Sequence, residues 1–168
     1  TNSAQFAIHA EYVAEMARQL VYEQFKEETY THGFNVYTTI TKEEQETAYA
    51  ALRKGVLDYE RRHGYRGPEA IVELPRNKEL ADEIIEKELA EHPDSDDILS
   101  AMVTEASPSA VKATLLNGEE IQITGPGLSF AAAGLKANAP PNKRIQRGAV
   151  IRVILEGKNW SIIQMPEV

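Results

Sequence analysis

The chain has 168 residues, of which 42% are hydrophobic and 26% are charged, and it contains no cysteine. This length suits one ordinary domain, or a small domain with additional helices. The composition is that of a folded globular protein rather than a disordered one, and the lack of cysteine excludes disulfides and thiolate metal sites. No apolar run approaches the ~20 residues that a membrane span needs, and no signal peptide is recognisable. We therefore expect a soluble protein or a soluble piece of a longer one.

The acidic residues are concentrated in one segment. The formal net charge of the chain is -8, and residues 79–97 alone hold nine carboxylates and one base, Lys87, which also sum to -8. The remainder balances at 17 acids and 17 bases. We expect the acidic segment to repel a polyanion, whereas the C-terminal part would not.

The N-terminal part of the chain is predicted to be helical. Residues 9–30 form an amphipathic pattern that stops at His32-Gly33, and residues 35–40 are β-branched and aromatic, which predicts a short strand. Thr41 and Glu44 make a capping box, so a second helix should begin there and end near His63. The apolar stripe of the first helix consists of Val13, Met16, Ala17, Leu20, Val21 and Phe25.

A third helix is predicted at residues 77–91, after a turn and a short strand in residues 65–75. This helix is acidic and ends at His92-Pro93. Its inward positions are expected to be Leu80, Ala81, Ile84, Ile85 and Leu89.

From about residue 98 the apolar period becomes two. Strands are predicted at residues 98–106, 110–116, 119–123, 149–155 and 160–165. Asn117-Gly118 marks a hairpin between the second and third of them. Residues 125–148 form a long connection, with a short helix expected around residues 129–134. The sequence therefore predicts an α+β protein in which N-terminal linker helices precede a five-stranded, OB-like Greek-key β-barrel.

The tetrad Ser109 to Lys112 has the Ser-x-x-Lys spacing of the serine acyltransferases that penicillin inhibits. That chemistry requires the serine to open a helix so that the lysine one turn later can take its proton. Here the tetrad lies in a strand pattern, where residues three apart point to opposite faces. We interpret it as an accident of composition, and we predict no catalytic residue in this chain.

No metal or cofactor site is predicted either. The four histidines are scattered singly along the chain, and a capping or solvated role is favoured over metal binding. Residues 94–97 (Asp-Ser-Asp-Asp) lack the glycine and distal glutamate of a calcium loop and are interpreted as a cap for the following strand. Residues 125–134 contain glycines but no Lys-Ser/Thr pair for a phosphate loop.

A basic group on and beside the fourth strand is the candidate partner-binding site. It could contact an anionic partner, although a solvated barrel edge is the alternative. A nucleic-acid platform is not expected, because the predicted barrel lacks interleaved aromatic and basic residues. A sugar-binding barrel would need an exposed aromatic beside an amide, for which Trp160 and Gln164 are the candidates. The residues of the basic group are Lys143, Arg144, Arg147 and Arg152.

The order of several stretches resembles the class A penicillin-binding proteins, specifically their 1A type. The stretches are "AEYVAEMARQLVYEQF", "YTHGFNVYTTITKEEQETAYAAL", "YRGPE" and "QRGAVIRVILEGKNWSIIQMPEV". In that family they join a membrane-proximal glycosyltransferase domain to a transpeptidase domain, with an OB-like insertion between the two. The family's transpeptidase serine follows the "QMPEV" region and its glycosyltransferase glutamates precede the first helix, so the resemblance places no catalytic residue on this chain.

The resemblance implies a division of the chain into three parts. Residues 1–34 would be the interdomain linker helix, residues 35–64 a strand-helix segment on the transpeptidase side, and residues 65–168 the OB-like domain. It also implies a periplasmic fragment of a single-span membrane protein that synthesises peptidoglycan. Its partners would be the other domains of the synthase and, as in enterobacterial relatives, an outer-membrane lipoprotein activator.

Two structural expectations follow from this picture. Residues 36–40 should pair with the final strand near residues 162–165, because both stretches would enter the next domain together. The apolar stripe of the first helix should be exposed in isolation, so this helix is expected to self-associate. The two functional readings that remain open are a docking and spacer module and a glycan-binding OB module.

Overall fold

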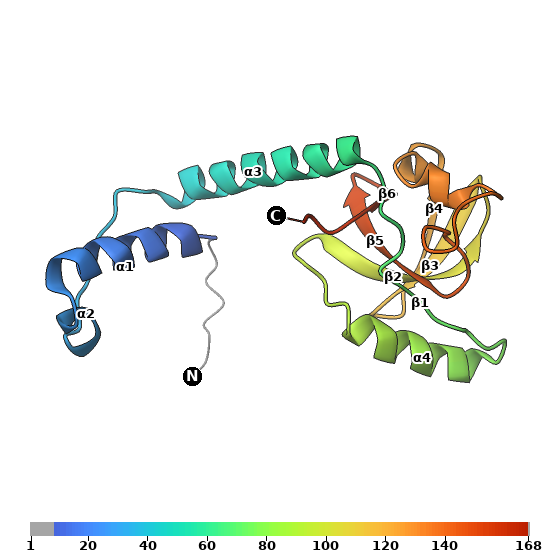
Figure 1. The fold of residues 1–168 in the computed structure, drawn as a ribbon, viewed down its shortest axis with the longest axis horizontal. Helices are drawn as coiled ribbons and strands as arrows, with labels where there is room; N and C mark the ends of the chain where they lie inside the picture. The colour runs from blue at the N-terminus through green and yellow to red at the C-terminus, as the bar shows by residue number, and fades with distance from the viewer. Residues whose placement is uncertain (1–8, 168) are drawn as a thin grey trace. The chain divides into compact units, whose positions relative to one another are not determined.

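The computed structural model describes residues 9–167 (Figure 1). The chain divides into two compact units, residues 1–56 and residues 57–168. The first unit contains α1 (Glu11–Phe25), α2 (Glu28–Thr31) and most of α3 (Lys42–His63), and the second contains the remaining elements. Within residues 9–167, no helix is both long and apolar enough to cross a membrane.

The predicted first helix is interrupted at Lys26. This residue has a φ of 51° and its N–H donates to the carbonyl of Tyr22 at 2.8 Å, which ends α1 and starts the turn to α2. Ring contacts hold the turn together: Tyr22 and Tyr30 are 5.8 Å apart, and Phe25 and Phe34 are 4.7 Å apart. α1 buries none of its residues: Met16, Leu20 and Phe25 of its apolar stripe are exposed, as expected, and the rest of the stripe is partly buried.

The strand predicted at residues 35–40 is not formed. Residues 33–41 have no regular structure, and Tyr37 is 92% exposed. The final strand β6 (Asn159–Ile163) pairs with β5 (Ala149–Glu156). Residues 36–40 belong to the first unit and the final strand to the second, so the expected pairing between them stays a prediction. β-propensity alone does not make a strand, because an isolated strand has no partner for its backbone hydrogen bonds.

The capping box predicted at the start of α3 is confirmed. The Thr41 hydroxyl accepts a hydrogen bond from the Glu44 N–H at 3.3 Å, and the Glu44 carboxylate accepts from the Thr41 N–H at 3.1 Å. α3 ends at Gly64, which has a φ of 86°. Its buried residues are Leu57 and Glu60, and both belong to the second unit.

The second unit is built on a six-stranded antiparallel sheet. β2 (Ile98–Ala106), β3 (Ala110–Leu115) and β4 (Glu120–Thr124) form a meander, and β5 returns through a long connection to pair with β2. This order is a Greek key. The OB-like α+β fold is thus confirmed, and the short strand expected within residues 65–75 is β1 (Ala70–Ile71), which joins the sheet as its sixth strand.

β5 is the centre of the sheet because it has three neighbours. One edge pairs with β2 along residues 98–102. The other edge is shared: Ala149 and Val150 pair with β1, and residues 152–156 pair with β6. No ladder joins β4 to β6 in the described part of the chain, so the barrel is not closed by hydrogen bonds. The 3₁₀ helix η1 (Gly125–Leu128) lies against both strands at this gap.

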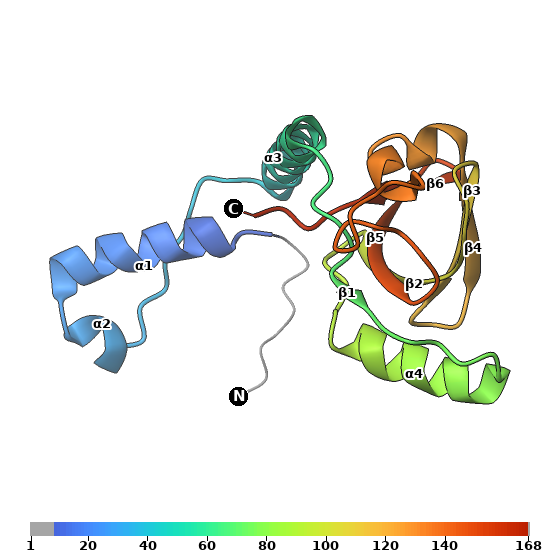
Figure 2. The ribbon, with the colours of Figure 1, turned by 45° about the vertical axis from the view of Figure 1, so that its right-hand side comes forward.

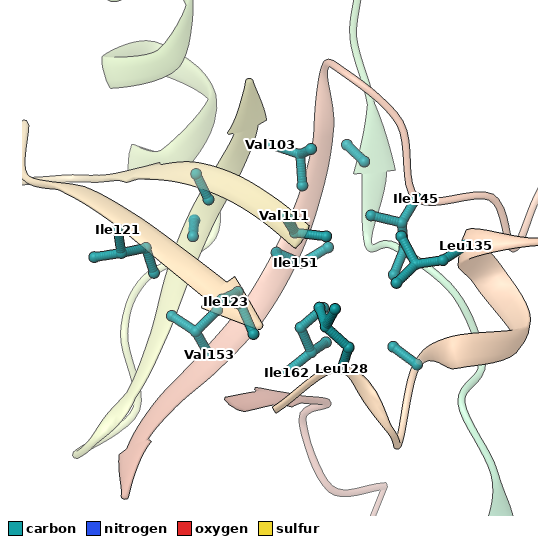
Figure 3. Close-up of a cluster of buried hydrophobic side chains, with 14 of the residues drawn as sticks. Val103, Val111, Ile121, Ile123, Leu128, Leu135, Ile145, Ile151, Val153 and Ile162 are labelled. Carbon is teal, nitrogen blue, oxygen red and sulfur yellow. The ribbon is translucent and has the colours of Figure 1, made fainter. Parts of the chain in front are cut away.

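The main core lies on the concave side of the curled sheet (Figure 3). β3 and β4 alternate buried and exposed residues, as the sequence period predicted, and they contribute Val111 and Ile123. The long connection closes over this core through η1 and η2 (Ala132–Leu135), which bury Leu128 and Leu135. The single short helix expected around residues 129–134 is therefore replaced by two 3₁₀ turns.

α4 (Lys78–Ala90) covers the other face of the sheet (Figure 2). The Asn77 side chain caps it by accepting from the Leu80 N–H at 3.1 Å. Its buried residues contact Met102 and Val150, so β2 and β5 are buried on both faces. Leu80 was expected to point inward but is 53% exposed, because the buried residues of the helix are spaced by four from Ala81 and Leu80 lies outside that stripe. The residues of α4 that are buried are Ala81, Ile85 and Leu89.

Candidate partner-binding surface

Arg152 does not belong to an accessible basic surface. It is 6% exposed, and its guanidinium donates to both carboxylate oxygens of Glu69 at 2.8 and 2.9 Å and to the Pro93 carbonyl at 2.7 Å. This arginine lies on β5 and ties the turn before β1 to the end of α4. The guanidinium is thus held by three internal acceptors, which disfavours a role of Arg152 at a surface, but the residue also lines a pocket of about 280 Å³, and its binding of a partner stays a prediction.

A histidine completes the cluster around Glu69. His92 Nδ1 lies 2.8 Å from a Glu69 oxygen, and His92 Nε2 lies 3.4 Å from Glu88. Burial alone would raise the pKa of Glu69, but its hydrogen bonds and its attraction to Arg152, together with His92, outweigh burial and hold this pKa below its ordinary value. The cluster is an internal ion-pair network that joins α4 to the sheet.

The other three residues of the predicted basic group lie in or near the long connection. Arg147 donates to the carbonyls of Thr104 at 3.1 Å and Pro75 at 2.9 Å, and Arg144 donates to the Ala139 carbonyl at 2.9 Å. Both guanidinium groups thus order backbone segments while remaining at least partly exposed. Lys143 is exposed beside them.

The connection and the end of β2 enclose a groove of about 510 Å³. Residues 104–106 form one wall, and residues 134–137 and 144–147 form the other. Arg144, Arg147 and Lys136 line this groove. The sequence did not indicate Lys136, because nothing in the sequence pattern shows that residue 136 lies near residue 144. Lys143 and Arg152 are not among the groove residues. The predicted basic group is thus divided between the groove, the surface and the interior.

A second polar cluster holds together the two ends of the OB-like unit. Glu60 is 2% exposed, and one of its oxygens accepts from Arg66 at 2.7 Å and from the Gln164 amide at 2.8 Å. The Gln164 carbonyl oxygen in turn accepts from the Arg66 N–H at 2.9 Å, and its amide also donates to the Gly64 carbonyl at 3.1 Å. We call Glu60, Arg66 and Gln164 the clasp.

The clasp carboxylate is charged at neutral pH. Burial would raise the pKa of Glu60, but hydrogen bonds from Arg66, from Gln164 and from the Glu167 N–H more than offset this, and the pKa lies below its ordinary value. Sequence reasoning did not identify Glu60, since a glutamate near the end of a polar helix is usually solvated. Its burial depends on Gln164, which follows 104 residues later.

Trp160 and Gln164, the pair considered for sugar binding, do not form an exposed site. Trp160 is half-buried and packs against the main core, and the carbonyl of Trp160 lies so close to Gly127 that a side chain there would not fit. Gln164 is 5% exposed and bonded within the clasp. The exposed aromatic ring beside an available amide that a sugar site needs is therefore not formed by these two residues.

The Ser-x-x-Lys tetrad is also divided as expected. Ser109 lies in the turn before β3, where its N–H donates to the Ser107 hydroxyl at 3.4 Å. Lys112 lies on β3 and pairs with Glu105 at 3.1 Å. The lysine thus has a carboxylate partner on β2 and does not serve as a base for Ser109.

The acidic loop before β2 caps that strand. The Asp94 carboxylate accepts from the Ser100 N–H at 2.8 Å. Within residues 9–167, no group of three or more histidine or acidic side chains is arranged to hold a metal ion.

Comparison with known proteins confirms the resemblance seen in the sequence. Residues 65–168 match the family model described as the penicillin-binding protein OB-like domain. The chain is 36% identical over 155 residues to penicillin-binding protein 1A of Neisseria flavescens, an alignment that covers 92% of this chain and 19% of that protein. It is 33% identical over 173 residues to penicillin-binding protein 1A of Escherichia coli (strain K12), covering 99% of this chain and 20% of that protein.

A solved structure agrees with these matches. The crystal structure of penicillin-binding protein 1A from Haemophilus influenzae superposes with a TM-score of 0.69 at 27% identity, covering 97% of this chain and 23% of that chain. This chain therefore spans about a fifth of the length of its relatives. On the match of its OB-like domain and of its preceding helices, the chain belongs to the penicillin-binding proteins of the 1A type.

Proposed function

We propose that this chain is a non-catalytic docking and spacer module of a bifunctional peptidoglycan synthase. The parent protein would combine peptidoglycan glycosyltransferase and penicillin-sensitive D,D-transpeptidase activities on the periplasmic face of the bacterial inner membrane. In this proposal residues 1–34 are the interdomain linker helix, residues 35–64 lead into the OB-like domain, and residues 65–168 form that domain. The module uses no cofactor and does not bind nucleic acid, and it meets the membrane only through the parent chain.

The clasp is the observation that carries the spacer part of this proposal. A domain inserted into another protein needs its incoming and outgoing segments to lie side by side, so that the host fold is not forced open. Here the Arg66 N–H donates to Gln164 at 2.9 Å, and Gln164 donates back to Gly64 at 3.1 Å. The Met165 carbonyl also accepts from Arg66. The body of the barrel then extends from a single point of attachment and is open to a partner.

The partners in this proposal are of two kinds. The other domains of the synthase cover the exposed apolar residues of the N-terminal unit, for example Met16 at 54% and Leu20 at 65% exposed. A cell-wall protein, such as an outer-membrane lipoprotein activator, docks on the OB-like domain. In isolation the same apolar stripe leads α1 to self-associate, and sedimentation velocity of the chain at several concentrations tests this. A monomer at every concentration would contradict self-association.

The experiment that tests the module's function removes it from the full-length synthase. Residues 66–164 are replaced by a short Gly/Ser linker, which can join Tyr65 to Met165 because the two segments are adjacent. We expect glycan polymerisation and cross-linking by the purified enzyme to persist, while stimulation by an outer-membrane lipoprotein fraction is lost. Loss of both basal activities in a variant that still binds fluorescent penicillin would show that the module contributes to catalysis itself.

A further inference from the structure

β2 extends beyond its last partner on β5. The pairing with β5 stops at Met102, so residues 104–106 have β3 on one side and the groove on the other. The Thr104 carbonyl on the groove side is capped by the Arg147 guanidinium at 3.1 Å. Ala106 lies beyond this cap, with a side chain too small to cover its own backbone.

The direction of the Ala106 backbone follows from the register. The Leu115 N–H donates to the Glu119 carbonyl at 2.9 Å, so Leu115 and every second residue before it on β3, including Val111, turn their backbone groups toward β4. Ala106 is opposite Val111. In an antiparallel pair both partners then turn their N–H and C=O away from each other, so those of Ala106 point to the groove edge.

The groove beside this edge is basic. Lys136, Arg144 and Arg147 line it, and the carboxylate among its lining residues, Glu105, is neutralised by Lys112 at 3.1 Å. Lys136 is exposed and forms no ion pair within residues 9–167. The surface therefore combines the unpaired backbone groups of Ala106 with three lining cations against one lining carboxylate, although the chain as a whole is acidic.

We propose that this groove binds an extended acidic peptide segment of a partner protein, which adds as a short strand to the edge of β2 and forms its backbone hydrogen bonds with Ala106. The two features select this ligand together: a free strand edge accepts an extended backbone, and the cations favour carboxylate side chains on it. The proposal rests on the docking function above and names its surface and the chemistry of its partner.

The strand edge is short, so the charges supply much of the affinity. Residues 104–106 offer few backbone hydrogen bonds, and binding is therefore expected to be weak and to fall as salt screens the cations over a Debye length of about 8–10 Å.

The probe is a fluorescein-labelled octapeptide of alternating threonine and glutamate, titrated into the 168-residue chain at low salt and followed by fluorescence anisotropy. The matched peptide carries lysine in place of glutamate and should bind at least about tenfold more weakly. In amide NMR spectra the signals of Glu105 and Ala106 should shift on addition of the acidic peptide, and exchange of the Ala106 amide should slow. Equal binding of the two peptides would overturn the proposal.

Substitutions separate the groove from the rest of the surface. Lys136→Glu should weaken binding about threefold to tenfold, and Lys136→Glu with Arg144→Glu should abolish it. Lys158→Glu, in the exposed turn between β5 and β6, makes the same charge change away from the groove and should leave binding unchanged. Arg144 also donates to the Ala139 carbonyl, so the double variant can lose stability. If the double variant melts at a lower temperature, the binding measured with the single Lys136 variant is the test of the proposal.

The backbone contribution is tested with the peptide rather than the protein. Methylation of alternate peptide nitrogens removes the donors that a strand would present to β2 but keeps every carboxylate. Two peptides are needed, one methylated at the odd-numbered and one at the even-numbered nitrogens. If both bind as tightly as the unmethylated peptide, the attraction is purely electrostatic and strand addition is refuted. The docking function is tested separately by the deletion variant of the full-length synthase. If that variant still responds to the lipoprotein fraction, the docking proposal is refuted. If the variant loses the response but the chain does not bind the peptide, the docking surface lies elsewhere on the module.

Discussion

Replacement of the buried Glu60 by alanine should weaken the OB-like unit much more than removal of an exposed charge. The carboxylate is 2% exposed and serves Arg66, Gln164 and the Glu167 N–H. Without it, the Gln164 NH₂ group keeps only the Gly64 carbonyl as acceptor, and Arg66 loses its buried counter-charge. Breaking a fully buried ion pair costs about 3–5 kcal/mol, but the Arg66 side chain is 37% exposed and recovers water, so we expect about 2–3 kcal/mol.

The assay is reversible unfolding of the chain by heat and by urea, followed by circular dichroism. For a unit of this size, 2–3 kcal/mol corresponds to a fall in Tm of roughly 8–12 °C. The matched control is Glu167→Gln, which removes a different partner of the same arginine: that carboxylate is 75% exposed and pairs with Arg66 at 3.1 Å. An exposed pair contributes about 0–1 kcal/mol, so this variant should unfold nearly like the parent.

The two variants together decide whether the clasp stabilises the unit. If Glu60→Ala and Glu167→Gln are equally mild, within about 0.5 kcal/mol of the unsubstituted chain, then the buried carboxylate does not hold the two ends of the domain and the reasoning is wrong. Glu60→Gln should lie between them, because an amide keeps the acceptor oxygen but presents its own N–H groups toward the Glu167 N–H.

Further predictions concern pH, packing and labelling. The pKa of Glu60 and of Glu69 is lowered in the folded state, so the stability they contribute is complete above their ordinary pKa of 4.5 and is lost as the pH falls below it; the Glu60→Ala chain should show a shallower loss of urea stability between neutral pH and pH 3. Tyr65→Phe should leave stability unchanged or raise it by up to about 1 kcal/mol in the same assay, since the buried Tyr65 hydroxyl has no hydrogen-bond partner in the structure; a loss of more than about 1 kcal/mol would show a bond in solution. Gly148→Ala should prevent stable folding, visible as a loss of the cooperative melt, because its φ is 91° and a β-carbon would overlap the Val72 carbonyl oxygen. Fluorescent penicillin should not label the chain at Ser109 or elsewhere, and a covalent adduct in a mass spectrum would contradict the non-catalytic assignment.

The local features of the fold were predictable because they depend on neighbours in sequence. The Thr41 capping box and the hairpin turn at Gly118, which has a φ of 83°, follow from residues three or fewer positions apart. The alternation in β3 and β4 predicted their buried faces, because one face of each strand meets the core and the other meets water.

The features that depend on distant residues were not predictable in the same way. Residues 35–40 have strong β-propensity and still form no strand, since propensity supplies no partner. Arg152 looked like a surface cation in an otherwise apolar strand, and its burial requires Glu69, 83 residues earlier. Lys136 and Arg144 lie on the same wall of the groove because the connection turns between them, at residues 137–138 and 141–143.

The shared edge of β5 has a consequence for how the protein is made. β5 is paired with β1, β2 and β6, so it supplies partners to strands that leave the ribosome as much as about 80 residues before it. Until residues 149–156 have been synthesised, the β2–β3–β4 meander has a long unpaired edge on β2, and α4 lacks Val150, one of the two buried sheet residues on which it packs. Such an edge pairs readily with other chains. During synthesis the unit is therefore most exposed to misassembly while the long connection is being translated, and the acidic segment at residues 79–97, made earlier, keeps nascent copies apart by charge repulsion at that stage.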